Sequence, residues 1–218
     1  MIGNSLSLYE YSSLALSDCL ERWYDCNIWS RVIDDCLRSI PKVLLDRCES
    51  SSQSYLLRKN RNRANTSSRV KPGPRFDGLL RNYPGRTQEF CVIESSPALR
   101  GGVISTKWLS DKAKVGKALR EMINRLDIEA NCERRVLDKL QVVGISTAGL
   151  TMQVSRMCRQ KGYVCLLTVN QPVQIPHSVE QFRELLVFLA GFLRVKVYSP
   201  PTTHPFIFSA ACPVSYSG

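Results

Sequence analysis

Two short apolar runs, RFDGLL at 75–80 and FCVIESS at 90–96, each carry one acidic residue among side chains that favour a sheet core. Asp77 lies in the first run and Glu94 in the second, and a turn containing Pro84 and Gly85 separates them. The pattern predicts neighbouring strands at 75–81 and 88–95. Because burying a charge costs free energy unless it has a partner, each acid needs a compensating group.

Hydrophobic spacing predicts the remaining elements. Steps of three, four and seven residues indicate a helix over 16–40, and a second stripe indicates a helix from Ser105 or Ser110 to about 127. Further strands are expected at 140–145, 150–154 and 163–169, followed by a helix that begins near Ser178. This order predicts an α/β fold, a mixed sheet of about five strands flanked by helices.

Composition along the chain predicts one α/β domain over 1–198. Within it, residues 49–74 are rich in Ser, Asn, Arg and Lys, and we interpret them as an exposed, mobile basic loop. The run at 41–47 is expected to add one more helical turn. Residues 199–218 contain four prolines and no Asp, Glu, Lys or Arg, which predicts a poorly ordered tail.

Charge is unevenly distributed. Residues 1–57 hold 5 Lys/Arg and 8 Asp/Glu, a net charge of −3, whereas residues 58–218 hold 25 and 11, a net charge of +14. This excess favours a nucleic-acid partner, DNA or RNA, although a merely basic surface is the plain alternative. The expected contact residues are those of the basic loop and one residue of the helix ending near 127: Arg58, Lys59, Arg61, Arg63, Arg69, Lys71 and Arg125.

Cysteines and histidines argue against several other classes of protein. The nine cysteines include no C-x-x-C pair and there are only two histidines, so a zinc site is not expected. Cysteines inside apolar runs predict free thiols and an intracellular protein, nuclear or cytoplasmic. No apolar window of about 18 residues suggests a membrane span. The spacing of a nucleotide-binding P-loop is missing, and no small-molecule cofactor is expected.

A divalent cation is one group that Asp77 and Glu94 can share. Mg²⁺ is usually held by one or two carboxylates together with water and substrate phosphate oxygens. Such an ion activates water and neutralises charge on a phosphodiester. The alternative needs no metal: Asp77-Gly78 turns the chain, and Glu94 forms a salt bridge with Arg75 or Arg81.

The runs RFDGLL and FCVIESS resemble the paired strands of the PD-(D/E)XK nuclease superfamily, the restriction-endonuclease-like fold. In that family one strand carries Asp, the next carries Glu-x-Lys, and a helix follows, within a mixed sheet flanked by helices. The resemblance covers 75–195 and extends to fungal open reading frames and to the nuclease-like domains of Crinkler-type effector proteins. It implies that Asp77 and Glu94 bind Mg²⁺ during phosphodiester hydrolysis.

The sequence departs from this family at one position. Ser96 stands where the family has its lysine, and serine cannot supply the positive charge. The resemblance implies that Lys107 or Lys114 assists from the following helix, or else that the site is inactive. Three functions therefore stay open: a metal-dependent nuclease, a nuclease-like binding module without activity, and an effector-like protein-interaction module.

Overall fold

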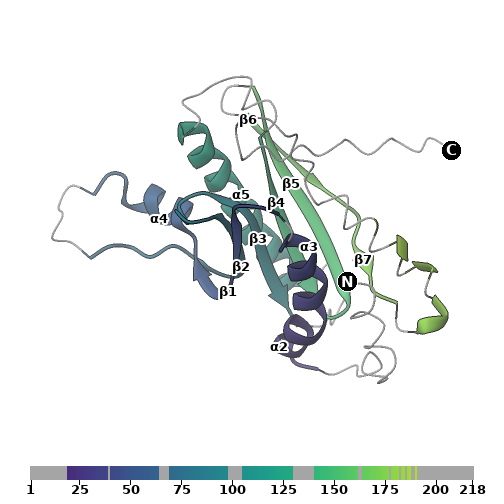
Figure 1. Ribbon diagram of the computed structural model, residues 1–218. Coiled ribbons are helices and arrows are strands. Elements are labelled where there is room, and N and C mark those ends of the chain that lie inside the picture. Colours follow the sequence, from purple (N-terminus) through teal and green to yellow (C-terminus); the bar gives the residue numbers. More distant parts are fainter. Residues whose placement is uncertain are drawn as a thin grey trace.

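The computed structural model describes residues 19–38, 40–63, 69–97, 105–129, 140–161, 164–176 and 178–181, with 183, 184, 186, 187 and 190 (Figure 1). The predicted tail at 199–218 and most of the predicted helix after Ser178 lie outside these residues. The elements in chain order are α2 (Glu21–Tyr24), η2 (Asp25–Asp34), α3 (Asp35–Leu37), β1 (Val43–Ser51), α4 (Gln53–Asn60), β2 (Arg75–Asn82), β3 (Glu89–Ser96), α5 (Thr106–Glu129), β4 (Gln141–Ala148), β5 (Thr151–Lys161), β6 (Val164–Val169), β7 (Val173–Gln174) and η4 (Val179–Gln181).

The described strands form one mixed sheet of seven, in the order β1-β2-β3-β4-β5-β6, with β7 paired to β5. Only β3 and β4 pair in parallel among these strands, and the other neighbours are antiparallel. A parallel pair requires a crossover connection, and α5 lies in that connection. The sheet flanked by helices confirms the predicted α/β fold; β1 and β7 are the strands that the sequence pattern missed.

Helices cover both faces of the sheet, as Figure 1 shows. A side-chain Cβ placed on Gly144 would lie 2.5 Å from Val115 of α5, so α5 packs directly over β4. On the other face, Arg47 is paired in register with Gly78 and contacts Asp25 and Asp34 of η2. The core between these layers is apolar, and Trp29 of η2 is tied to the β4–β5 turn by its indole N–H, which donates to Gly149 O at 2.8 Å.

Two predictions for residues 41–74 were wrong. The run expected to extend the first helix is β1, which pairs with β2 along most of its length. Inside the expected mobile loop lies the helix α4, whose first turn is capped by Ser52 Oγ accepting from Tyr55 N at 3.3 Å. Both elements depend on partners distant in sequence, which a local pattern of polar and basic residues does not reveal.

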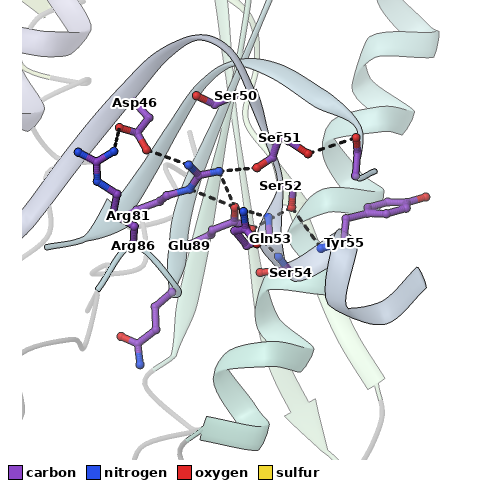
Figure 2. A network of polar contacts seen from close by, with 12 residues as sticks. Asp46, Ser50, Ser51, Ser52, Gln53, Ser54, Tyr55, Arg81, Arg86 and Glu89 are labelled. Carbon is purple, nitrogen blue, oxygen red and sulfur yellow. Dashed lines mark hydrogen bonds and ion pairs between the residues drawn. The ribbon is translucent and has the colours of Figure 1, made fainter. Parts of the chain in front are cut away.

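A buried carboxylate explains why α4 forms. Glu89 is fully buried, and its oxygens accept from Ser52 Oγ, Gln53 N and Ser54 N at 2.8–3.0 Å (Figure 2). The first backbone N–H groups of a helix have no partner within it and attract negative charge. Glu89 thus fastens the start of α4 to the sheet.

Arg81 balances the charge of Glu89 from the neighbouring strand. Its guanidinium lies 3.1 Å from Glu89 Oε1 and 2.8 Å from Asp46 Oδ2, and it also donates to Ser51 O at 2.5 Å (Figure 2). Arg81 therefore joins β1, β2 and β3 in one buried network. This is a different partner from the one that the salt-bridge alternative assigned to Arg81, which was Glu94.

Candidate functional site

Asp77 and Glu94 lie on neighbouring antiparallel strands, β2 and β3. Gly78 is paired with Ile93, and one further step in the same register sets Asp77 opposite Glu94. The strands do not simply continue pairing there, because Ser95 N–H donates to the side-chain Oδ2 of Asp77 at 2.7 Å. The other carboxylate oxygen of Asp77 accepts no hydrogen bond from any residue that the structure describes.

Glu94 is buried with half of its carboxylate unused. The residue is 5% exposed, and Oε1 accepts from Lys114 Nζ at 2.6 Å. Oε2 is buried and has no hydrogen-bond partner among the described residues. An unpaired buried acceptor costs about 1–3 kcal/mol, so this oxygen marks a place where a positive or hydrogen-bonding group is missing.

The two lysines expected to assist occupy different positions on α5. Lys114 pairs with Glu94, and its ammonium also lies 4.7 Å from the centre of the Phe76 ring. Lys107 instead forms an ion pair with Asp111 at 2.7 Å. The hydroxyl of Ser96 donates to the same Asp111 at 2.5 Å. The structure therefore brings Lys114 into direct contact with Glu94 and places Lys107 on Asp111 instead.

Burial dominates the protonation of both acids. Burial raises the pKa of Glu94 from 4.5 to about 7; the hydrogen bond and charge of Lys114 oppose this, and the charges of Asp77 and Asp111 add to it. The pKa of Asp77 is also raised, mainly by burial, against the hydrogen bond from Ser95 N. Because Asp77 raises the pKa of Glu94 and Lys114 lowers both pKa values, the three groups share one electrostatic environment.

Further acids that the sequence did not single out surround this pair. Burial raises the pKa of Glu21 of α2, and the charge of Asp77 raises it further. Asp25 of η2 accepts from Ser95 Oγ at 3.4 Å. Glu49 adds to the raised pKa of Asp77 from a bulge in β1, where its φ is 57°. Only the fold brings these acids to Asp77, because 28 to 56 residues of sequence separate them from it.

Asp34, another acid of η2, forms an ion pair with β1. Its Oδ1 accepts from Arg47 Nη2 at 2.5 Å, and Arg47 Nη1 also contacts Asp25 at 2.8 Å. Asp34 is thus an ion-pair residue that holds η2 to β1.

A cation fits the chemistry of the Asp77–Glu94 pair. In the part of the chain that is described, no group of three or more His, Cys, Asp or Glu residues is arranged to hold a metal ion. Two carboxylates are nevertheless sufficient for Mg²⁺ when water and phosphate oxygens complete the coordination. Glu94 Oε2 and one oxygen of Asp77, which have no hydrogen-bond partner among the described residues, are the acceptors that a cation would use.

The predicted basic contact residues lie on and around α4. Arg58 fixes α4 to α5 through Glu121 at 2.8 Å, seven residues or about 10 Å along the helix beyond Lys114. Lys59 donates to Pro72 O, and Asn60 bonds the backbone of Lys71. The end of α4 and residues 71–72 therefore contact each other. The exposed basic side chains here are Arg58, Lys59, Arg61, Arg69 and Lys71.

Arg63 and Arg125 are less available. Arg63 is half-buried. Arg125 forms an ion pair with Glu129 of the same helix at 2.6 Å. Separations of 7 and 18 residues nevertheless place Lys107, Lys114 and Arg125 within about 20° of one another around α5.

No arginine in the described ranges forms an ion pair with Asp77 or Glu94. Among the described residues, Arg81 contacts Asp46 and Glu89, and the ionic partner of Glu94 is Lys114.

No helix in the described ranges has the length and apolar character needed to cross a membrane. Comparison of the chain with protein-family models, with curated proteins and with solved structures finds no match.

The raised pKa of Glu94 predicts a pH-dependent loss of stability. The folded state favours the protonated acid, so this stabilisation is complete below about pH 4.5 and is lost as the pH rises through 7. Relative to Glu94→Gln, the wild type should lose about 3 kcal/mol of unfolding free energy between pH 4.5 and 8. Urea unfolding of both proteins without divalent cations measures this difference. A difference that stays constant with pH contradicts the assigned pKa, and Glu180→Gln, at an exposed site, serves as the control.

Proposed function

We propose that the chain binds nucleic acid and hydrolyses its phosphodiester bonds with a divalent cation, Mg²⁺, held by Asp77 and Glu94. The observation that carries this is the buried Glu94 carboxylate: Oε1 accepts from Lys114, Oε2 has no hydrogen-bond partner among the described residues, and the charge of Asp77 helps raise the pKa of Glu94. The succession of a helix, an Asp strand, a Glu strand and the helix α5 supports the resemblance to the PD-(D/E)XK superfamily.

Asp77 and Glu94 are the residues that would hold the cation. A bound divalent ion supplies an activated water and neutralises charge on the phosphate. In hydrolysis the water oxygen forms a bond to phosphorus, and the bond from phosphorus to one ester oxygen breaks. Both carboxylates lie on internal strands of the sheet, and Glu94 is near the C-terminal end of β3, where Lys114 of the first half of α5 contacts it.

Lys114 supplies the positive charge that Ser96 lacks. Its ammonium is held on Glu94 at 2.6 Å, within reach of a phosphate that approaches the same carboxylate. A preorganised donor of this kind stabilises charge that develops in the transition state. Ser96 acts indirectly: it orients Asp111, and Asp111 fixes Lys107 at the same end of α5.

The basic surface of α4 is the proposed contact for the sugar–phosphate backbone. Arg61, Arg69 and Lys71 are exposed, and the Glu89 network fastens α4 at a fixed place beside α5. Phosphate contacts of this kind give affinity without sequence preference and are weakened by salt. DNA and RNA are equally suited to such a surface.

A second candidate function is nucleic-acid binding without cleavage. It is favoured by Ser96 at the family's lysine position and by the ion pair between Lys114 and Glu94, which satisfies part of the acid's charge without metal. An intracellular location belongs to either proposal, since the described cysteines, Cys91 among them, are free thiols.

The direct test is incubation of the purified chain with single- and double-stranded DNA and RNA in Mg²⁺, in Mn²⁺ and in EDTA. Cleavage in either metal and none in EDTA is expected. Filter binding at low and moderate salt, run in parallel, separates the two candidates. Binding that weakens with salt but is never followed by cleavage would support the binding module and contradict the nuclease.

Two lysine variants form a matched pair for the role of Lys114. Lys114→Met is expected to reduce the cleavage rate about 100-fold, since it removes the charge that contacts Glu94. Lys107→Met should reduce it less than about tenfold, because Lys107 contacts Asp111 instead. Single-turnover cleavage rates measure both effects. Equal losses in the two variants, or a larger loss for Lys107→Met, would contradict this assignment.

A further inference from the structure

A cavity of about 240 Å³ lies on the side of α5 away from Lys114, between that helix and β4, β5 and β6. Lys112 and Gly116 line it from α5, and Ser146, Gln153, Leu167 and Val169 line it from the sheet. The strand register connects it to the candidate site, because Glu94 pairs with Ser146 and Ser146 pairs with Gln153. Gln153 is therefore two strands, or about 10 Å, from Glu94.

The floor of the cavity carries an acceptor without a donor. Gln153 is 7% exposed, and its Nε2 donates to Asn170 O at 2.8 Å. That bond fixes the amide orientation and leaves Oε1 buried with no hydrogen-bond partner among the described residues. Ser146, only 4% exposed, adds a hydroxyl beside it. The floor can accept a hydrogen bond from an N–H group on a ligand.

The walls of the cavity differ from its floor. Leu167 and Val169 of β6 form an apolar wall opposite Gly116, where the missing side chain opens space over the sheet. Lys112 adds a positive charge, and no acidic partner for it is found in the described ranges. An apolar slot with one polar floor and one cation suits a flat heterocycle with N–H donors that carries a phosphate. The volume is below the range for drug-sized ligands, about 300–1,000 Å³, so it suits a single ring system.

We propose that this cavity binds the base of one nucleotide of the nucleic-acid substrate, an inference that rests on the proposed function. The base lies between Gly116 and the Leu167–Val169 wall, and its N–H edge donates to Gln153 Oε1. Lys112 contacts the phosphate of the same nucleotide. The nuclease would thereby hold its substrate in register by one buried base, in addition to the backbone contacts of α4.

Binding of mononucleotides tests this without any cleavage. AMP, UMP and ribose 5-phosphate are titrated into the full chain without divalent cations, and binding is followed by ligand-observed NMR. AMP or UMP is expected to bind at least about tenfold more tightly than ribose 5-phosphate, which lacks the base. Equal binding of all three would overturn the proposal, since it would show phosphate contact with the basic surface alone.

Variants of the cavity complete the test. A Cβ on Gly116 would lie 3.8 Å from Leu167, which is an ordinary van der Waals contact. Gly116→Leu therefore fills the cavity, and leucine has a higher helix propensity than glycine. It should weaken AMP binding about tenfold or more, and Gln153→Met should weaken it about fivefold by removing the acceptor. Ser110→Leu, an exposed change on α5, is the control. Unchanged AMP affinity in Gly116→Leu and Gln153→Met contradicts the proposal.

The outcomes separate this inference from the proposed function. Metal-dependent cleavage by the wild type together with no base-dependent binding would overturn the cavity and leave the nuclease standing. Base-dependent binding that Gly116→Leu abolishes, in a chain that cleaves nothing in Mg²⁺ or Mn²⁺, would support the cavity as a nucleotide site and overturn the nuclease.

Discussion

The Asp77→Asn variant is expected to lose cleavage about 100- to 1,000-fold while it still folds and binds nucleic acid. Asn keeps the shape of the side chain and an oxygen that can accept from Ser95 N, so the local backbone contact at 2.7 Å survives. What it removes is one of the two negative charges that would hold the cation. The loss should therefore appear in the rate of cleavage and in the metal concentration required.

Asp35→Asn is the matched control for this change. Asp35 lies in α3 and forms an ion pair with the exposed side chain of Arg38 at 3.8 Å. This ion pair does not include Asp77 or Glu94. Cleavage by this variant should stay within about twofold of the wild type, as expected for a weak surface pair. If Asp77→Asn cleaves as fast as Asp35→Asn under saturating Mg²⁺, Asp77 is not part of the catalytic machinery.

Glu89→Ala is expected to lower the free energy of unfolding by about 3–5 kcal/mol. Among the described residues, the substitution leaves the buried guanidinium of Arg81 with Asp46 as its one acidic partner, and it removes the acceptor for Gln53 N and Ser54 N. Each loss lowers the free energy of unfolding, because a buried polar group without a partner is costly. Urea unfolding followed by circular dichroism measures the change.

The same variant should also release α4. Because Glu89 fastens the helix start, proteolysis after Arg58, Lys59 or Arg61 is expected to accelerate before the sheet unfolds. Glu180→Ala, at an exposed residue of η4, should change the unfolding free energy by less than about 0.5 kcal/mol. If Glu89→Ala changed the free energy of unfolding by an equally small amount, the network around Glu89 would not stabilise the fold.

The strands that carry Asp77 and Glu94 could be predicted because each acid lies inside a short apolar run of the kind that forms the core of a sheet. The helix α5 could be predicted for a similar reason, since its apolar stripe repeats at helical spacing. In both cases the information lies within a single segment of about 10 to 20 residues. Such segments specify their own secondary structure and leave only pairing to the fold.

The helix α4 and the partner of Glu94 could not be predicted in the same way. The start of α4 is stabilised by Glu89, which lies 36 residues after Gln53, and the basic composition of 49–74 suggests a solvated loop. The choice of Lys114 over Lys107 depends on how α5 packs over β3, because both lysines lie on the same side of that helix. Long-range contacts decide both, and a sequence pattern does not contain them.

The acids around Asp77 show the same limit. Glu49 reaches the site through a bulge in β1, and Glu21 through the packing of the first helix. Neither position carries a motif. Both lie in the acidic first quarter of the chain, and charge alone would predict that this part is not at a nucleic-acid site. Only the fold therefore reveals that these acids surround Asp77.

Titration of Mn²⁺, a spectroscopic substitute for Mg²⁺, is the most direct test of the claim that Asp77 and Glu94 hold a divalent cation. Electron paramagnetic resonance of free Mn²⁺ measures binding to the wild type, to Asp77→Asn and to Glu94→Gln, with no nucleic acid present. One bound ion in the wild type, with affinity at least about tenfold lower in both variants, is the predicted result. Binding that is the same in all three proteins, or that is undetectable in the wild type at millimolar Mn²⁺, would contradict it.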